Sequence, residues 1–110
     1  MAESVFKGPI GAGSIAAKFL SDVSNEDSDL LIISYAPRGG GNAEVDQDAA
    51  APGGFADVSV EAPRRGVLEV TVAIGHAADS GRLIVSRNEA EVHNEPIRGS
   101  VRWIYAVEAA

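Results

Sequence analysis

Apolar and polar residues alternate along most of this chain, and the pattern is strongest after Gly66. The even-numbered residues from Leu68 to Ile74 are apolar, and Glu69 and Thr71 lie between them. A period of two is typical of a strand with one buried face. A second apolar run, 83–85, follows a segment that opens and closes with glycine. The pattern therefore predicts a hairpin of 66–74 with 82–87, around which the other strands assemble.

Two further segments alternate in the same way. Residues 55–62 place Ala56, Val58 and Val60 on one face. Residues 100–108 place Trp103 and Tyr105 on one face, together with Val101 and Val107. Large aromatic side chains supply much of the buried area of a small core, so we expect Trp103 and Tyr105 inside.

Residues 89–93 are mostly polar and fit an edge strand, and residues 94–99, which include Pro96, are expected to form a loop.

Residues 14–23 fit two structures. As a strand, this segment places on one face Ile15, Ala17, Phe19, Ser21 and Val23. As a helix capped by Ser14, it places on one face Ile15, Phe19, Leu20 and Val23. The strands elsewhere favour the strand. Residues 30–35 are apolar on both faces, which predicts a central strand covered on both sides and paired with 15–23 as a hairpin.

Glycine and proline mark the irregular segments. Residues 1–13 are expected to form an arm or short edge strand anchored by Phe6, because Pro9 cannot donate to a central ladder. Residues 36–54 are expected to form one long loop, in which 44–45 form at most a brief strand. The prediction is an all-β fold: a single antiparallel β-sandwich or barrel of about seven to eight short strands.

Composition narrows the class of protein. A chain of 110 residues forms one domain, here 1–110, and the absence of cysteine excludes disulfides and thiolate metal sites. The net charge of −7 disfavours nucleic acid and anionic membranes as partners. The longest apolar run, 30–33, is too short to span a bilayer, and the N-terminus lacks the pattern of a signal peptide. We expect synthesis in a cytoplasm.

The charge is unevenly distributed. Residues 22–48 hold seven acidic residues and one base, Arg38, whereas residues 82–102 hold four arginines and three glutamates. This polarity suggests that copies pack head to tail, although a solvated surface explains it equally well.

Three short segments resemble ligand-binding motifs, but we interpret none of them as a ligand site. Residues 11–16 have the form G-x-G-x-x-A, but Gly8 and Pro9 interrupt the strand that a dinucleotide site needs before it. A single Arg-Gly-Gly at 38–40 fits a turn better than an RNA-binding segment. The acidic run 22–29 lacks the spacing of a calcium loop.

One set of residues carries the side chains of catalysis or of metal binding: His76, Asp79, Ser80, Glu91 and His93. It shows neither a nucleophile elbow nor a metal-ligand spacing. We therefore expect no enzyme, no metal and no cofactor.

Function is then expected to lie in surfaces. The leading hypothesis is a structural or assembly module that contacts protein, either itself as a homo-oligomer or another subunit, such as a decoration or tail component of a virion. The alternative is a lectin-like module that binds carbohydrate. For either function the long loop offers the candidate binding residues Arg38, Asn42, Asp46, Gln47 and Asp48.

Overall fold

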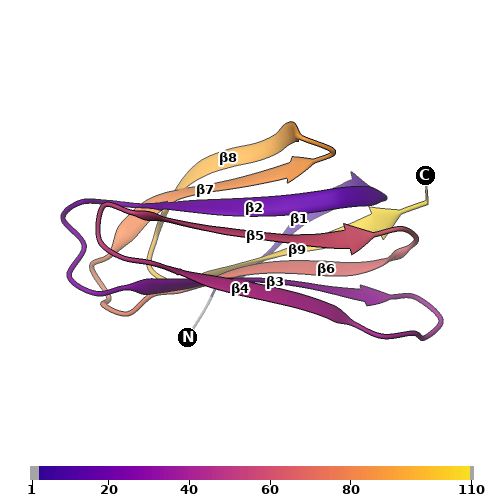
Figure 1. Ribbon diagram of the computed structural model, residues 1–110, viewed down its shortest axis with the longest axis horizontal. Coiled ribbons are helices and arrows are strands. Elements are labelled where there is room, and N and C mark those ends of the chain that lie inside the picture. The colour runs from indigo at the N-terminus through magenta and orange to yellow at the C-terminus, as the bar shows by residue number, and fades with distance from the viewer. Residues whose placement is uncertain (1–2, 110) are drawn as a thin grey trace.

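The computed structural model describes residues 3–109 as two β-sheets packed face to face (Figure 1). Sheet A has the order β1 (Glu3–Gly11), β9 (Val101–Glu108), β6 (Gly66–Ala73), β3 (Asp29–Pro37) and β4 (Glu44–Ala50). Sheet B has the order β5 (Phe55–Ala62), β2 (Gly13–Ser21), β7 (Ser80–Arg87) and β8 (Ala90–Arg98). The described residues form an all-β sandwich of nine strands, rather than seven to eight, and no closed barrel.

The alternating patterns place the core correctly. Residues 14–21 of segment 14–23 belong to β2, residues 22–23 begin the following loop, and no helix forms there. Leu68, Val70 and Val72 are fully buried, as is Tyr105, and Trp103 is 3% exposed. The inward faces of both sheets meet in one hydrophobic cluster, so each alternating strand buries the face that its pattern predicts.

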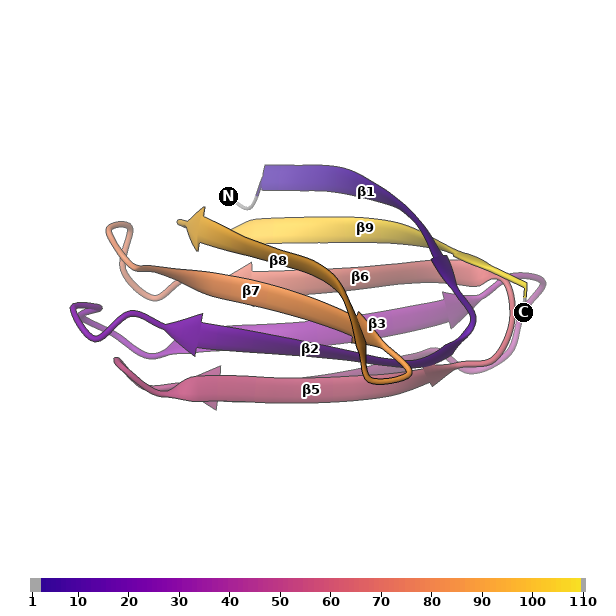
Figure 2. The same ribbon diagram turned by 90° about the horizontal axis from the view of Figure 1, so that it is seen from above.

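Both predicted hairpins are wrong. β6 pairs with β3 and β9 in sheet A, and β7 pairs with β2 and β8 in sheet B. Likewise β2 and β3 lie in different sheets. After β2 and again after β6 the chain crosses from one sheet to the other. In Figure 2, β2 and β7 of sheet B lie over β3 and β6 of sheet A. Alternation shows which face of a strand is buried, but it does not show which strand lies beside it.

One tight hairpin does form, between β7 and β8. Asn88 and Glu89 have φ angles of 49° and 69°, which is the left-handed pair that a two-residue type I′ turn requires. β8 then continues to Arg98, so the loop predicted at 94–99 is largely strand. Pro96 is tolerated because β8 is an edge strand.

The predicted long loop at 36–54 is also interrupted. Residues 44–50 form β4, which pairs with β3 along its whole length. Two short connections remain, 38–43 and 51–54. Every residue of β4 before Ala50 is exposed, so this strand lacks the buried apolar face by which sequence patterns reveal strands.

β1 lies at the edge of sheet A, as Pro9 requires, but it runs parallel to β9. The sandwich is therefore not wholly antiparallel. Residues 1–2 of the predicted arm lie outside the described residues. Phe6 is 65% exposed and so does not anchor the strand. A register shift between Phe6 and Gly8 inserts Lys7 as an extra residue, and such a bulge redirects its side chain.

Side chains close the two open sides of the sandwich. On one side, Lys7 of β1 reaches Glu95 of β8, with Nζ 2.6 Å from Oε2. On the other side, Asp46 and Asp48 of β4 accept hydrogen bonds from the main-chain N–H groups of Ser59 and Asp57 in β5, each at 3.0 Å. Charged side chains thus link the edge strands of the two sheets, β1 with β8 on one side and β4 with β5 on the other.

β3 is central, but its predicted cover on both sides is wrong. Leu31, Ile33 and Tyr35 are buried, whereas Leu30 and Ile32 on the other face are half-buried. A two-layer sandwich covers only the inner face of each sheet, and residues 3–109 include no helix to form a third layer. In the same range, no helix is long and apolar enough to cross a membrane.

Candidate binding surface

The outer face of sheet A carries apolar side chains on all five strands, with polar residues such as Glu69, Thr71 and Arg102 between them. Strand register places Ile104 beside Phe6 on β1, and Val67 between Ala36 and Ala106. At the far edge of the sheet, Val45 of β4 is 65% exposed. We refer to this surface as the outer face of sheet A; its apolar members are Phe6, Leu30, Ile32, Ala36, Val45, Val67, Ile104 and Ala106.

This surface has the size and charge of a contact surface. Four strand spacings by six residues correspond to roughly 400 Å². Near the middle, Arg102 Nη1 lies 3.4 Å from Glu69 Oε1, so these two charges neutralise one another. Apolar patches of several hundred Å² on a monomer commonly mark interaction sites.

A pocket of about 570 Å³ lies at one end of this face, where β3, β6 and β9 meet the loops. Ala36, Val67 and Ala106 line it with apolar groups. Arg38, Arg65 and Glu108 also line it, and both arginine side chains are exposed. We refer to it as the arginine pocket.

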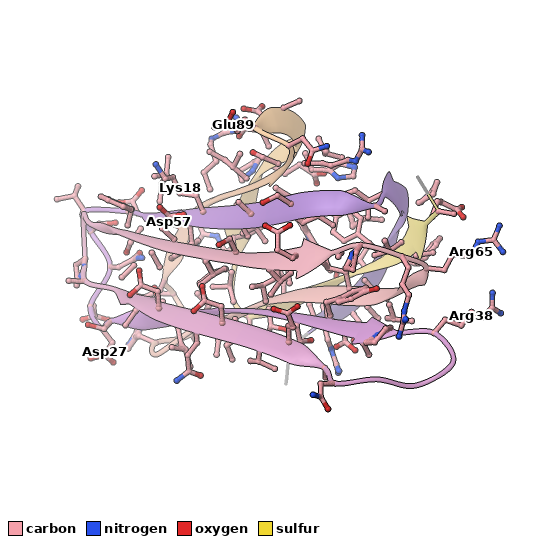
Figure 3. All side chains as sticks on the ribbon, turned by 45° about the vertical axis from the view of Figure 1, so that its right-hand side comes forward. Lys18, Asp27, Arg38, Asp57, Arg65 and Glu89 are labelled. Atoms are coloured by element: carbon pink, nitrogen blue, oxygen red, sulfur yellow. The ribbon has the colours of Figure 1, made fainter. Side chains whose placement is uncertain are left out.

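The two arginines belong to different loops that are joined by a main-chain hydrogen bond, Arg38 N–H to the Arg65 carbonyl at 2.8 Å. Figure 3 shows both side chains projecting from the same end of the molecule. Within residues 3–109 neither guanidinium forms an ion pair. Unpaired arginines beside an apolar pocket favour an anionic group attached to an apolar one.

The opposite end of the molecule holds a buried polar network. Asn25 donates to the carbonyl of Ser80 at 2.8 Å and accepts from its N–H at 2.9 Å. Asp29 accepts from the N–H of Gly75 at 2.7 Å, and Asp79 accepts from the N–H of Glu26 at 2.9 Å. These bonds tie the loop 22–28 to the loop 74–79.

Asp29 and Asp79 are each 1% exposed and close enough to interact. Burial raises the pKa of Asp29, and the charge of Asp79 raises it further, while the hydrogen bond from Gly75 opposes both. No group of three or more metal-binding side chains occurs among the described residues. The network therefore holds the two loops in position.

The five residues considered for catalysis are divided among separate contacts. His76 Nε2 lies 2.8 Å from Glu26 Oε2 in the loops, whereas His93 Nδ1 on β8 lies 2.8 Å from the Tyr105 hydroxyl on β9. Asp79 belongs to the buried network, where Ser80 contributes main-chain groups. Glu91 is exposed on β8. No contact joins the two histidines to one another or to a shared carboxylate within residues 3–109.

The pair of His93 and Tyr105 lies in an aromatic cluster at the side of the sandwich closed by Lys7. Burial raises the pKa of Tyr105, so its hydroxyl keeps its proton and shares a hydrogen bond with His93 Nδ1. Lys7 Nζ lies 4.5 Å from the centre of a Trp103 ring, and His93 packs edge-on against Trp103 at 6.0 Å. The cluster buries a cation against aromatic faces, which stabilises this side of the sandwich.

The candidate residues of the predicted loop occupy different sites. Arg38 lines the arginine pocket, and Asn42 is exposed in the short loop before β4. Asp46 and Asp48 face β5 and bind its N–H groups, while Gln47 points to the other side of β4. The structure thus brings Arg38 together with Arg65 rather than with the other four. The signal for Arg65 was the basic turn Arg64-Arg65, which the sequence places far from Arg38.

A second groove, of about 580 Å³, lies on the outer face of sheet B. Ser14, Lys18, Asp57, Ser86 and Glu89 line it, together with small apolar side chains. Figure 3 shows Lys18, Asp57 and Glu89 on this face. Beside it, Lys18 Nζ lies 4.8 Å from the centre of the Phe55 ring, which is exposed.

Comparisons with known proteins add no assignment: no family model matches the chain, and neither the curated proteins nor the solved structures contain a significant match.

Proposed function

We propose that this protein is a non-enzymatic structural or assembly module that binds protein subunits through the outer face of sheet A. The observation that carries the proposal is the uncovered apolar row on β3. Leu30 and Ile32 belong to a strand that is apolar on both faces, yet residues 3–109 place no layer over the outer face, where both side chains are half-buried. Another folded subunit supplies such cover.

Three features support a protein as the partner. The face is formed by the five neighbouring strands of one sheet and is open over most of its length, rather than enclosed like a small-molecule site. Its central charges are paired with one another. The exposed side chains at both edges, Phe6 and Val45, extend the apolar surface across the whole sheet. A role as a decoration or tail component of a particle is consistent with these features.

The test measures molar mass by light scattering over a range of protein concentrations. The variant Phe6→Ser/Val45→Ser removes two exposed apolar side chains from the outer face of sheet A, so we expect self-association to weaken at least about tenfold. The matched control is Phe55→Ser/Leu20→Ser, which removes side chains of similar exposure from sheet B. Equal losses in both variants, or none in either, would contradict the proposal.

Carbohydrate binding is the second candidate, and the groove on sheet B favours it over the predicted loop. Its serine hydroxyls and carboxylates are groups that bind sugars, and Phe55 offers an exposed ring beside them. Asp46 and Asp48 are already occupied by the N–H groups of β5. Titration with a panel of soluble oligosaccharides, followed by the amide NMR shifts of Lys18 and Ser86, tests this candidate; unchanged shifts would exclude the sugars used.

A further inference from the structure

The two ends of the molecule carry opposite charges. β3 begins beside the loop 22–28 and ends at Arg38, so these features lie about 30 Å apart along one strand. The longest dimension of the molecule is 41 Å. Figure 3 shows Asp27 at one end and Arg38 and Arg65 at the other.

The acidic end carries an apolar tip. Val23 is 83% exposed, more than any other large apolar side chain in the described residues, and it lies between Asp22 and the pair Glu26 and Asp27. An apolar side chain among acidic residues is the inverse of the arginine pocket, whose lining combines two arginines with apolar residues. We refer to residues 22–28 as the acidic tip.

Hydrogen bonds hold the acidic tip in one conformation. The Asp22 carboxylate accepts from the N–H of Ser24 at 2.9 Å and from its hydroxyl at 2.7 Å, and these bonds lower the pKa of Asp22. The Asp22 carbonyl also accepts from the N–H of Gly53 at 3.1 Å. Below the tip, the buried side chain of Asn25 is anchored to Ser80. A tip ordered before contact loses little conformational entropy when it binds.

We propose that the acidic tip of one molecule docks in the arginine pocket of a second copy of the same chain. Val23 lies against the apolar floor formed by Ala36, Val67 and Ala106. Asp27 faces the two arginines, together with Glu26, whose carboxylate also lies 2.8 Å from His76 Nε2. The contact is head to tail, so each molecule keeps one free tip and one free pocket, and the copies form a ring or a filament. This inference rests on the proposed assembly function, names a second copy as the partner, and adds a contact that is separate from Phe6 and Val45.

Charge explains why a second copy fits. The protein carries a net charge of −7, so copies repel one another in most orientations. The head-to-tail orientation brings the acidic tip to a pair of arginines that have no ion partner in residues 3–109. Glu108 on the pocket rim reduces this attraction but leaves two guanidinium groups against one carboxylate. The area of one loop in one pocket is small, so a weak, salt-sensitive contact is expected.

The experiment reverses the charge of each end separately and then mixes the variants. Glu26→Lys/Asp27→Lys has two basic ends, and Arg38→Glu/Arg65→Glu has two acidic ends. In sedimentation velocity at about 50 mM salt we expect the wild type to associate as its concentration rises, and to lose most association at about 0.5 M salt. Each variant alone stays monomeric, whereas a 1:1 mixture associates again, because every basic tip then meets an acidic pocket and every acidic tip an arginine pocket.

Restored association in the mixture also shows that both variants fold. The control for charge is Asp57→Lys/Glu89→Lys, which replaces two acidic residues of sheet B by lysine, as Glu26→Lys/Asp27→Lys does at the tip. A wild type that remains monomeric at about 1 mM in low salt overturns the inference. Association that survives in both reversed variants also overturns it. Suppose that association survives in both charge-reversed variants. If Phe6→Ser/Val45→Ser then abolishes it, the proposed function stands without the contact between tip and pocket. If association survives in Phe6→Ser/Val45→Ser as well, the proposed function and this inference are both wrong.

Discussion

Asp29 shows how one residue connects the stability of this fold to pH. Its carboxyl group is buried beside Asp79, and this burial raises its pKa above the ordinary value of 3.8. The folded protein therefore keeps a proton that the unfolded chain releases as the pH rises past about 3.8. Between pH 3.8 and the raised pKa of Asp29, the folded state binds more protons than the unfolded chain. The contribution of Asp29 to stability therefore falls as the pH rises through this range, and it is constant at pH values above the raised pKa.

We predict that Asp29→Asn removes this contribution. The difference in the free energy of unfolding, wild type minus variant, should decrease as the pH rises from about 3.8 through the raised pKa of Asp29. Urea denaturation of both proteins between about pH 3.5 and pH 7 measures it. The control is Asp57→Asn, which removes an exposed carboxylate from sheet B. Parallel pH curves for the wild type and Asp29→Asn would show that the raised pKa has no effect on stability.

Single residues of the core were predictable, and the reason is local. Leu68, Val70 and Trp103 occupy alternating positions, and the pleat of a strand turns such positions to one face whatever lies beside it. Phe6 was the exception, because a register shift in β1 leaves its ring outside. A bulge depends on the neighbouring strand, and the sequence of β1 does not contain that information.

At the scale of elements, β4 shows how charged side chains protect a sheet edge. β5 pairs with β2 on one side only, so the N–H groups of Asp57 and Ser59 lack a strand partner. Asp48 and Asp46 supply carboxylate acceptors for them. Unpaired edges promote pairing with other chains, and these bonds block that route at β5.

We predict that Asp46→Ala/Asp48→Ala lowers the free energy of unfolding by about 1 to 3 kcal/mol, since two charge-assisted hydrogen bonds at an exposed edge are lost. Amide hydrogen exchange at Asp57 and Ser59 should accelerate, and the protein should aggregate sooner on heating. Gln47→Ala, on the opposite face of the same strand, is the control. If exchange at Asp57 and Ser59 is unchanged, the carboxylates do not protect this edge.

Strands with a buried face were predictable, but their partners and β4 were not. β5, β6 and β9 each alternate, and their predicted ranges agree closely with the observed ones. The predicted hairpins failed because β6 and β7 are joined by a short connection yet lie in different sheets. A short connection crosses between two packed sheets as easily as it reverses within one, so its length does not identify the pairing.

At the scale of the molecule, the order of the strands should make folding slow. Only β3–β4 and β7–β8 join strands that are consecutive in the chain; every other pair in residues 3–109 joins distant segments, and β1–β9 joins the first strand to the last. Non-local pairs must overcome the entropy of closing long loops before they stabilise the fold.

We therefore predict refolding over about 10 ms to seconds after dilution from urea. Trp103 is the single tryptophan of the chain and is buried, so its fluorescence reports the formation of the core. Stopped-flow fluorescence measures the rate. Complete recovery of the signal within microseconds would contradict this prediction.

The candidate binding surface was only partly predictable. The sequence identified Arg38 as a candidate and showed that acidic and basic segments are separated. It did not show that Arg38 and Arg65 line one pocket, because they meet only through the hydrogen bond between two loops. The apolar outer face was visible as the two-sided pattern of 30–35, but that pattern was interpreted as a strand already covered.

The sequence by itself determined the β class, the single apolar face of most strands and the uneven charge, because each of these depends on neighbours along the chain. Tertiary structure alone decided which strands pair, which edges need carboxylates and which face of sheet A has no cover. It also decided that the acidic tip and the arginine pocket lie at opposite ends of the molecule. These features depend on contacts between residues far apart in the chain, and such contacts form only when the two sheets pack around their common core.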